Sequence, residues 1–208
     1  WDAGVRLFVL DRLAVEEAVL PTYAYPYSNH FETAVEREQW FSAGTWTVAT
    51  GANDRPSYDG THHLDNNILE IGQQEHDDNH FAVLNGVIDI PVTANLPVLS
   101  YVYRMQLVSD GDEVVIKVKP EGDSEWQVLR NYLPQHDKAQ YNRDEISLAA
   151  YVGQRIQIGF FQRISVVDVD RLFSVDNIRV ADRDTTNFAF PYYNGFDDVA
   201  RDDEWSMQ

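Results

Sequence analysis

The stretch EVVIKVKPEGDSEWQVLR, residues 113–130, contains two runs of alternating apolar and polar residues with a turn between them. Successive side chains of a β-strand point to opposite faces, so each run predicts a strand. The segment PEGDS is rich in turn-forming residues and is typical of a five-residue loop between antiparallel strands. The stretch therefore predicts a β-hairpin. Its buried face includes Ile116 and Val118.

The same alternation recurs along most of the chain. In RIQIGFF, residues 155–161, the side chains of Ile156, Ile158 and Phe160 share one face, which we expect to be buried in the core. Similar runs are TWTVAT (45–50), NILEIG (67–72), LSYVYRMQLV (99–108) and LFSVDNIRV (172–180). Many short strands separated by turns favour an all-β, two-sheet jelly-roll β-sandwich. Residues 145–151 are the only plausible helical piece, and we interpret them as a short connecting turn.

The two ends of the chain resemble each other. RLFVLDRLAV (6–15) matches RLFSVDNIRV (171–180) at five of ten positions, and YAYPYSNHFETAVEREQW (23–40) matches FAFPYYNGFDDVARDDEW (188–205) at six of eighteen. Composition alone would give roughly two identities over both. Both matches lie 165 residues apart, which indicates a tandem repeat. We expect the tail of one unit at 1–18, a complete unit at 19–184 and the head of the next at 185–208.

Charge and composition exclude several classes of function. The formal net charge is −18 and there is no cysteine. Such an acidic chain is unsuited to nucleic acid or to an anionic membrane surface, both of which need Lys and Arg. No apolar run approaches the length of a membrane span, so we expect no membrane insertion. An acidic, cysteine-free surface is compatible with an extracellular location where cations screen the charge, although an ordinary acidic soluble protein would look alike.

A family resemblance emerges from the order of several motifs. After Phe31-Glu32, taken as an opening strand, come Trp40, FAVLNGVIDIP (81–91), the hairpin, SLAAYVGQRIQIGFFQRI (147–164) and FSVDNIRV (173–180). Over roughly residues 29–180 the chain resembles the MAM-like jelly-roll modules of bacterial secreted adhesins and proteases. That group includes the cleaved-adhesin or "choice-of-anchor J" domains. The resemblance implies a jelly roll with an adhesive or carbohydrate-associated role.

The resemblance also implies a structural calcium ion, bound by Glu32 and Asp176. Asn177 stands where the family more often has a second acid, so its contribution would be an amide oxygen. The repeat supports the two acids, because Glu32 recurs as Asp197 and Asp176 as Asp11. Further oxygen donors lie in HLDNN (63–67), interpreted as a loop, and in EHDDNH (75–80). The alternative for these two segments is a solvated acidic loop.

Aromatic residues alternate at the repeated junction. They are Tyr23, Tyr25 and Tyr27 in the first copy and Phe188, Phe190 and Tyr192 in the second. Each set would lie on one face of an extended segment, and we interpret both as contacts between neighbouring units or copies of the protein. The alternative is a platform on which sugar rings stack.

Other chemistry finds less support in the sequence. His62, His63, His76 and His80 could hold zinc, but loop histidines on the surface explain them more simply. Paired acids are expected by chance among 34 carboxylates, and no nucleophile motif is present, so we predict no enzyme. The function predicted is an extracellular tandem β-sandwich repeat with a structural or adhesive role in a large bacterial surface protein or filament. The alternatives are a lectin-like, carbohydrate-binding module and an ancillary domain of a secreted hydrolase.

Overall fold

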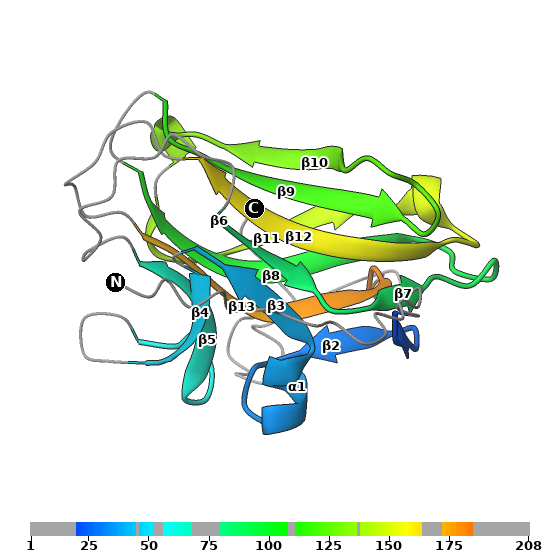
Figure 1. Ribbon diagram of the computed structural model, residues 1–208, viewed down its shortest axis with the longest axis horizontal. Coiled ribbons are helices and arrows are strands. Elements are labelled where there is room, and N and C mark those ends of the chain that lie inside the picture. The colour runs from blue at the N-terminus through cyan, green and yellow to red at the C-terminus, as the bar shows by residue number, and fades with distance from the viewer. Residues whose placement is uncertain are drawn as a thin grey trace, which may run out of the picture.

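Two β-sheets packed face to face form the body of the protein (Figure 1). The computed structural model describes residues 20–44, 46–51, 56–67, 80–107, 111–136, 138–163 and 172–184. The predicted flanking units, with Phe188, Phe190, Tyr192 and most of the EHDDNH segment, lie outside these ranges. The predicted jelly-roll sandwich is confirmed.

The first sheet, sheet A, is built around one long central strand. β12 (Arg155–Arg163) pairs antiparallel with β9 along one edge and with β6 and β7 along the other. The outer positions belong to β10 beside β9, β3 beside β6, and β1, which joins β7 in parallel. The remaining strands of this sheet are β1 (Thr22–Tyr23), β3 (Trp40–Ala43), β6 (His80–Leu84), β7 (Val87–Asp89), β9 (Glu113–Pro120) and β10 (Gln127–Tyr132).

The second sheet, sheet B, has the closing strand at its centre. β13 (Leu172–Asp182) pairs antiparallel with β8 on one side and with β5 and β2 on the other. β11 adjoins β8, and β4 adjoins β5. The remaining strands of this sheet are β2 (Tyr27–Asn29), β4 (Trp46–Thr50), β5 (His62–Asn67), β8 (Pro97–Gln106) and β11 (Lys138–Ser147).

The predicted hairpin is present and supplies part of the core. β9 and β10 pair antiparallel, and side chains along β9 alternate strictly between partly exposed and buried. The core between the sheets includes every residue that we predicted to be buried: Ile116, Val118, Ile156, Ile158 and Phe160. Inward alternation on both sheets therefore creates one apolar layer.

The segment that enters the domain differs from its prediction. Phe31 and Glu32 do not form an opening strand, because the chain leaves β2 and turns at Phe31, whose φ is +62°. It then enters a five-residue helix, α1 (Ala34–Glu38), below the sandwich in Figure 1. Thr33 caps this helix and exchanges hydrogen bonds with Glu36, the arrangement known as a capping box. Two 3₁₀ turns, η1 (Pro134–His136) and η2 (Ala149–Tyr151), complete the elements; η2 is the predicted connecting turn, whereas residues 145–147 belong to β11.

Two further expectations about local structure are wrong. The HLDNN segment is not a loop but most of strand β5. Tyr23, Tyr25 and Tyr27 do not share one extended face, because Tyr23 belongs to sheet A and Tyr27 to sheet B. Tyr27 is only 5% exposed and belongs to the core, and Tyr23 and Tyr25 pack against that core. The contact between units that we assigned to these rings stays a prediction.

None of the helices within the described ranges is long and apolar enough to cross a membrane.

Candidate functional site

Asp176, a predicted metal ligand, lies where β13 is irregular. The pairing of β13 with β8 shifts between Asp176 and Arg179, and Asn177 takes a φ of +50°, which Asn tolerates better than most residues. The carboxylate is fully buried and accepts N–H bonds from Tyr58 (3.1 Å), Asp59 (3.2 Å) and Asn177 (2.7 Å). Burial nevertheless raises the pKa of Asp176 to about 6, and the nearby charge of Glu32 adds to the rise.

Glu32 holds the same segment from the other side. Its carboxylate accepts N–H bonds from Thr61 and His62, each at 2.8 Å, and an O–H bond from Thr61 at 3.0 Å. The N–H of His62 is the main cause that lowers the pKa of Glu32 to about 2. Gly60, at φ +62°, leaves room for this carboxylate, because a Cβ there would lie 2.4 Å from its Cδ atom. Glu32 and Asp176 thus fix residues 58–62 against sheet B.

The predicted calcium ion would need about six to eight oxygen ligands. Oε1 of Glu32 and Oδ2 of Asp176 each accept two N–H bonds. Only the second oxygen of each carboxylate therefore has a lone pair left for a metal ion. The Oδ1 atom of Asn177 lies 2.7 Å from Nδ1 of His30. Within the described ranges no three His, Asp or Glu side chains gather in a way that could hold a metal ion. Calcium at Glu32, Asp176 and Asn177 stays a prediction.

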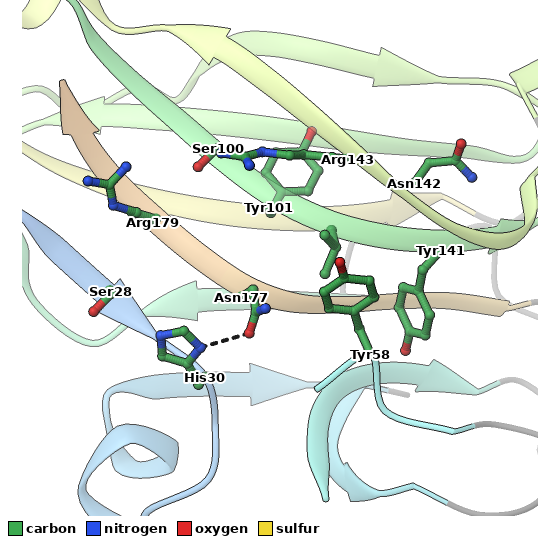
Figure 2. A pocket seen from close by; sticks show the side chains of 11 residues that line it. Ser28, His30, Tyr58, Ser100, Tyr101, Tyr141, Asn142, Arg143, Asn177 and Arg179 are labelled. Carbon is green, nitrogen blue, oxygen red and sulfur yellow. Dashed lines mark hydrogen bonds between the residues drawn. The ribbon is translucent and has the colours of Figure 1, made fainter. Parts of the chain in front are cut away.

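A groove of about 300 Å³ lies beside these residues on the outer face of sheet B (Figure 2). Strands β2, β8, β11 and β13 and the segment before β5 contribute its walls. The lining residues are Ser28, His30, Tyr58, Ser100, Tyr101, Val102, Tyr141, Asn142, Arg143, Asn177 and Arg179. A volume of this size suits a small ligand or a short segment of a polymer.

Strand register places three polar side chains in one row across the groove. Arg179 of β13 is paired with Ser28 of β2 on one side and with Ser100 of β8 on the other. Residues that face each other across neighbouring strands project from the same face of a sheet. The Arg179 side chain therefore leaves the sheet between two serine side chains.

Two tyrosine rings stand at the other end of the groove (Figure 2). The rings of Tyr58 and Tyr141 contact each other edge to face, with centroids 5.6 Å apart. Tyr58 is 54% exposed, and its backbone N–H is bound to Asp176. The carboxylate that we predicted as a metal ligand therefore positions an exposed ring at the lip of the groove.

The groove differs in charge from the rest of the molecule. The chain has a formal charge of −18. Among the described residues that line the groove, Arg143 and Arg179 are basic and none is acidic. The groove is thus a local basic site with an aromatic wall and several hydrogen-bonding side chains.

Among the described residues no histidine cluster forms the zinc site that we weighed, and His76 lies outside the described ranges. The interpretation as surface loop histidines is wrong for His62 and His63, which belong to strand β5. His62 and His63 point to opposite sides of β5, since His62 lies 3.7 Å from Glu32 and His63 is completely buried. Nδ1 of His63 lies 3.1 Å from Oγ of Ser57, and its Nε2 lies 3.9 Å from Asp65. This order resembles a hydrolytic triad, but 3.9 Å between His63 and Asp65 is too long for the hydrogen bond that orients a catalytic imidazole. The absence of enzymatic activity stays a prediction.

Aromatic rings also follow one another across the outer face of sheet A. Phe41, Phe81, Phe161 and Trp126 form a row in which neighbouring ring centroids are 5.1–6.0 Å apart. Lys117 lies over the ring of Phe161 at 4.5 Å, and Lys119 over that of Trp126 at 5.2 Å. These rings contact each other and the lysines, and Phe41 is the most exposed, at 56%.

Sequence reasoning missed Tyr58, Tyr141, Arg143 and Arg179 as groove residues. The alternation of the closing strand could have placed Arg179 on the outer face of its sheet. No sequence signal shows that Tyr58 lies beside Asp176, because 118 residues separate them in the chain.

Solved structures share the fold. The K2 cleaved adhesin domain of Lys-gingipain is 11% identical with a TM-score of 0.51, and the match covers 75% of this chain and 99% of that chain. The K1 cleaved adhesin domain of Lys-gingipain from Porphyromonas gingivalis W83 has the same identity and TM-score, with 76% and 99% covered. No protein-family model matches the sequence, and no curated protein does. The jelly-roll part of the resemblance is confirmed; the tandem repeat and the choice-of-anchor J assignment stay predictions.

A carbohydrate-binding module of family 61, solved with β-1,4-galactotriose, is a more distant match. It is 12% identical with a TM-score of 0.46, and the match covers 69% of this chain and 88% of that chain. A similarity this low carries no argument about ligands.

Proposed function

We propose that this domain is an adhesive module that binds carbohydrate in the groove on the outer face of sheet B. The observation that carries the proposal is the groove itself. It combines an exposed tyrosine ring with a row of planar and hydroxyl side chains, in a volume of about 300 Å³. An apolar ring suits the C–H face of a pyranose, and Asn and Ser side chains suit its hydroxyl groups.

The acidic, cysteine-free composition and the repeated ends support an extracellular setting with several modules in series. In that setting the module is part of a bacterial surface or secreted protein. Several linked copies, each of which binds weakly, then bind a surface with a higher overall avidity. Neighbouring units would then pack through the aromatic junction, and calcium at Glu32 and Asp176 would be structural. An ancillary role beside a hydrolase is the second candidate, since the groove would serve it equally.

The test is a glycan array probed with four forms of the protein: the unchanged protein and three single variants. Tyr58→Ala removes a ring that is 54% exposed in the groove, and Phe41→Ala removes one that is 56% exposed on the opposite sheet. We expect the unchanged protein and the Phe41→Ala control to bind the same glycans. Tyr58→Ala should lose most of this binding, whereas Tyr58→Phe should keep it. Absence of glycan binding by the unchanged protein, or equal binding by Tyr58→Ala, would overturn the proposal.

A further inference from the structure

Arg179 is the feature of the groove that glycan binding in general does not explain. It is exposed, yet none of its contacts among the described residues is an ion pair. Sugars without charge are bound well by neutral amide and hydroxyl groups. A guanidinium without an anionic partner is more useful to a ligand that brings the anion with it.

The positive charge of the second arginine in the groove, Arg143, is only partly neutralised by a carboxylate. Arg143 lies 3.5 Å from Glu145, but the same carboxylate accepts a shorter bond of 2.9 Å from Nε of Arg183. One carboxylate therefore serves two guanidinium groups. The groove keeps positive charge although the whole chain is strongly acidic.

The surroundings of Arg179 suit a carboxylate in particular. The serines paired with it in the neighbouring strands, Ser28 and Ser100, carry hydroxyl groups that can donate hydrogen bonds, and a planar guanidinium matches the two oxygens of a carboxylate. Figure 2 shows Tyr58 and Tyr141 at the opposite end from Arg179. A ligand that fills the groove therefore needs an anion at one end and an apolar ring face at the other.

We propose that the groove selects a pyranose that carries a carboxylate, and that Arg179 binds this carboxylate. The inference rests on the proposed carbohydrate-binding function and names its ligand class. Two sources share the chemistry, namely uronic acids of acidic polysaccharides and sialic acids of animal glycans. A row with one arginine and two hydroxyl groups accepts the carboxylate of either.

The experiment compares carboxylated sugars with their neutral counterparts by titration calorimetry. The pairs are trigalacturonate with its methyl ester and sialyllactose with lactose. We expect the acidic member of at least one pair to bind about tenfold more tightly or better, since charge-assisted hydrogen bonds are stronger than neutral ones. Raising the salt concentration should weaken only the acidic member. The pair that shows the difference identifies the source.

Variants connect the effect to Arg179. Arg179→Gln should lower the affinity for the acidic sugar to that of its neutral counterpart. Arg179→Lys should lower this affinity by a smaller factor, since the positive charge remains. Arg155→Gln is the matched control, because Arg155 is exposed on sheet A and paired with Glu121. Thermal unfolding of each variant checks that it is folded.

Three results would overturn the inference. One is equal binding of acidic and neutral sugars, or binding of neutral sugars alone, which would leave the proposed function standing. Another is unchanged affinity of Arg179→Gln. The third is equally tight binding of a glutamate-rich peptide, which would point to an acidic protein partner. If neither acidic nor neutral sugars bind, the proposed function fails as well.

Discussion

Truncation of Phe160 tests whether the two sheets are held together as the structure shows. The side chain is completely buried, and its ring lies against those of Trp40, Trp46, Tyr101 and Phe173 at centroid distances of 5.5–6.4 Å. Phe→Ala at such a site costs about 3–5 kcal/mol. Because Phe160 has four aromatic partners, we expect Phe160→Ala to fall near the upper end of this range, with a loss of about 4–5 kcal/mol in the free energy of unfolding.

Phe160→Leu is the milder variant. It keeps most of the volume but loses the ring pairs, each worth about 0.5–1.5 kcal/mol and not additive, so we expect a loss of about 2 kcal/mol. The assay is urea unfolding followed by tryptophan fluorescence, because Trp40 and Trp46 contact this ring. Phe41→Ala, truncated at a site that is 56% exposed, should cost under about 1 kcal/mol. A Phe160→Ala loss below about 1 kcal/mol, or one equal to the control, would refute the reasoning.

Three further predictions concern the segment at residues 58–62. A chelator should lower the melting temperature, because an ion bound only to the folded state stabilises it; identical melting curves would exclude the predicted calcium. With its pKa raised to about 6, Asp176 contributes stability that is present below its ordinary value of 3.8 and lost as pH rises through about 6. Subtracting the unfolding free energies of Asp176→Asn from those of the unchanged protein should show this fall; a flat difference over that window would contradict it. Gly60→Ala should weaken glycan binding along with stability, because its Cβ would displace Glu32 and release Tyr58; unchanged binding would show that the segment does not position this ring.

Local alternation made much of the sandwich predictable. The hairpin of β9 and β10 requires only alternating apolar and polar residues and a turn, and both are visible within eighteen residues of sequence. The region around Phe31 was not predictable in this way. A positive φ at a phenylalanine has no sequence signature, and the short helix after it is signalled only by the spacing of Thr33 and Glu36.

The site was predictable only in part, because it depends on contacts between distant segments. Glu32 and Asp176 were singled out by resemblance, and both do hold one segment of the chain. What that segment presents to solvent, the ring of Tyr58, depends on hydrogen bonds across more than a hundred residues. The row of Ser28, Arg179 and Ser100 likewise requires the order of three strands that are not consecutive in sequence.

The most direct test of carbohydrate binding in this groove is an NMR titration of the isotopically labelled protein with a glycan that the array identifies. We predict that the signals that move belong to groove residues, above all the side-chain amides of Asn142 and Asn177 and the Nε–H of Arg179. The indole N–H of Trp126, on the opposite sheet, should stay in place and serve as the internal control. Movement of the Trp126 signal with no change at Asn142, Asn177 and Arg179 would contradict the account and place the glycan on the aromatic row of sheet A.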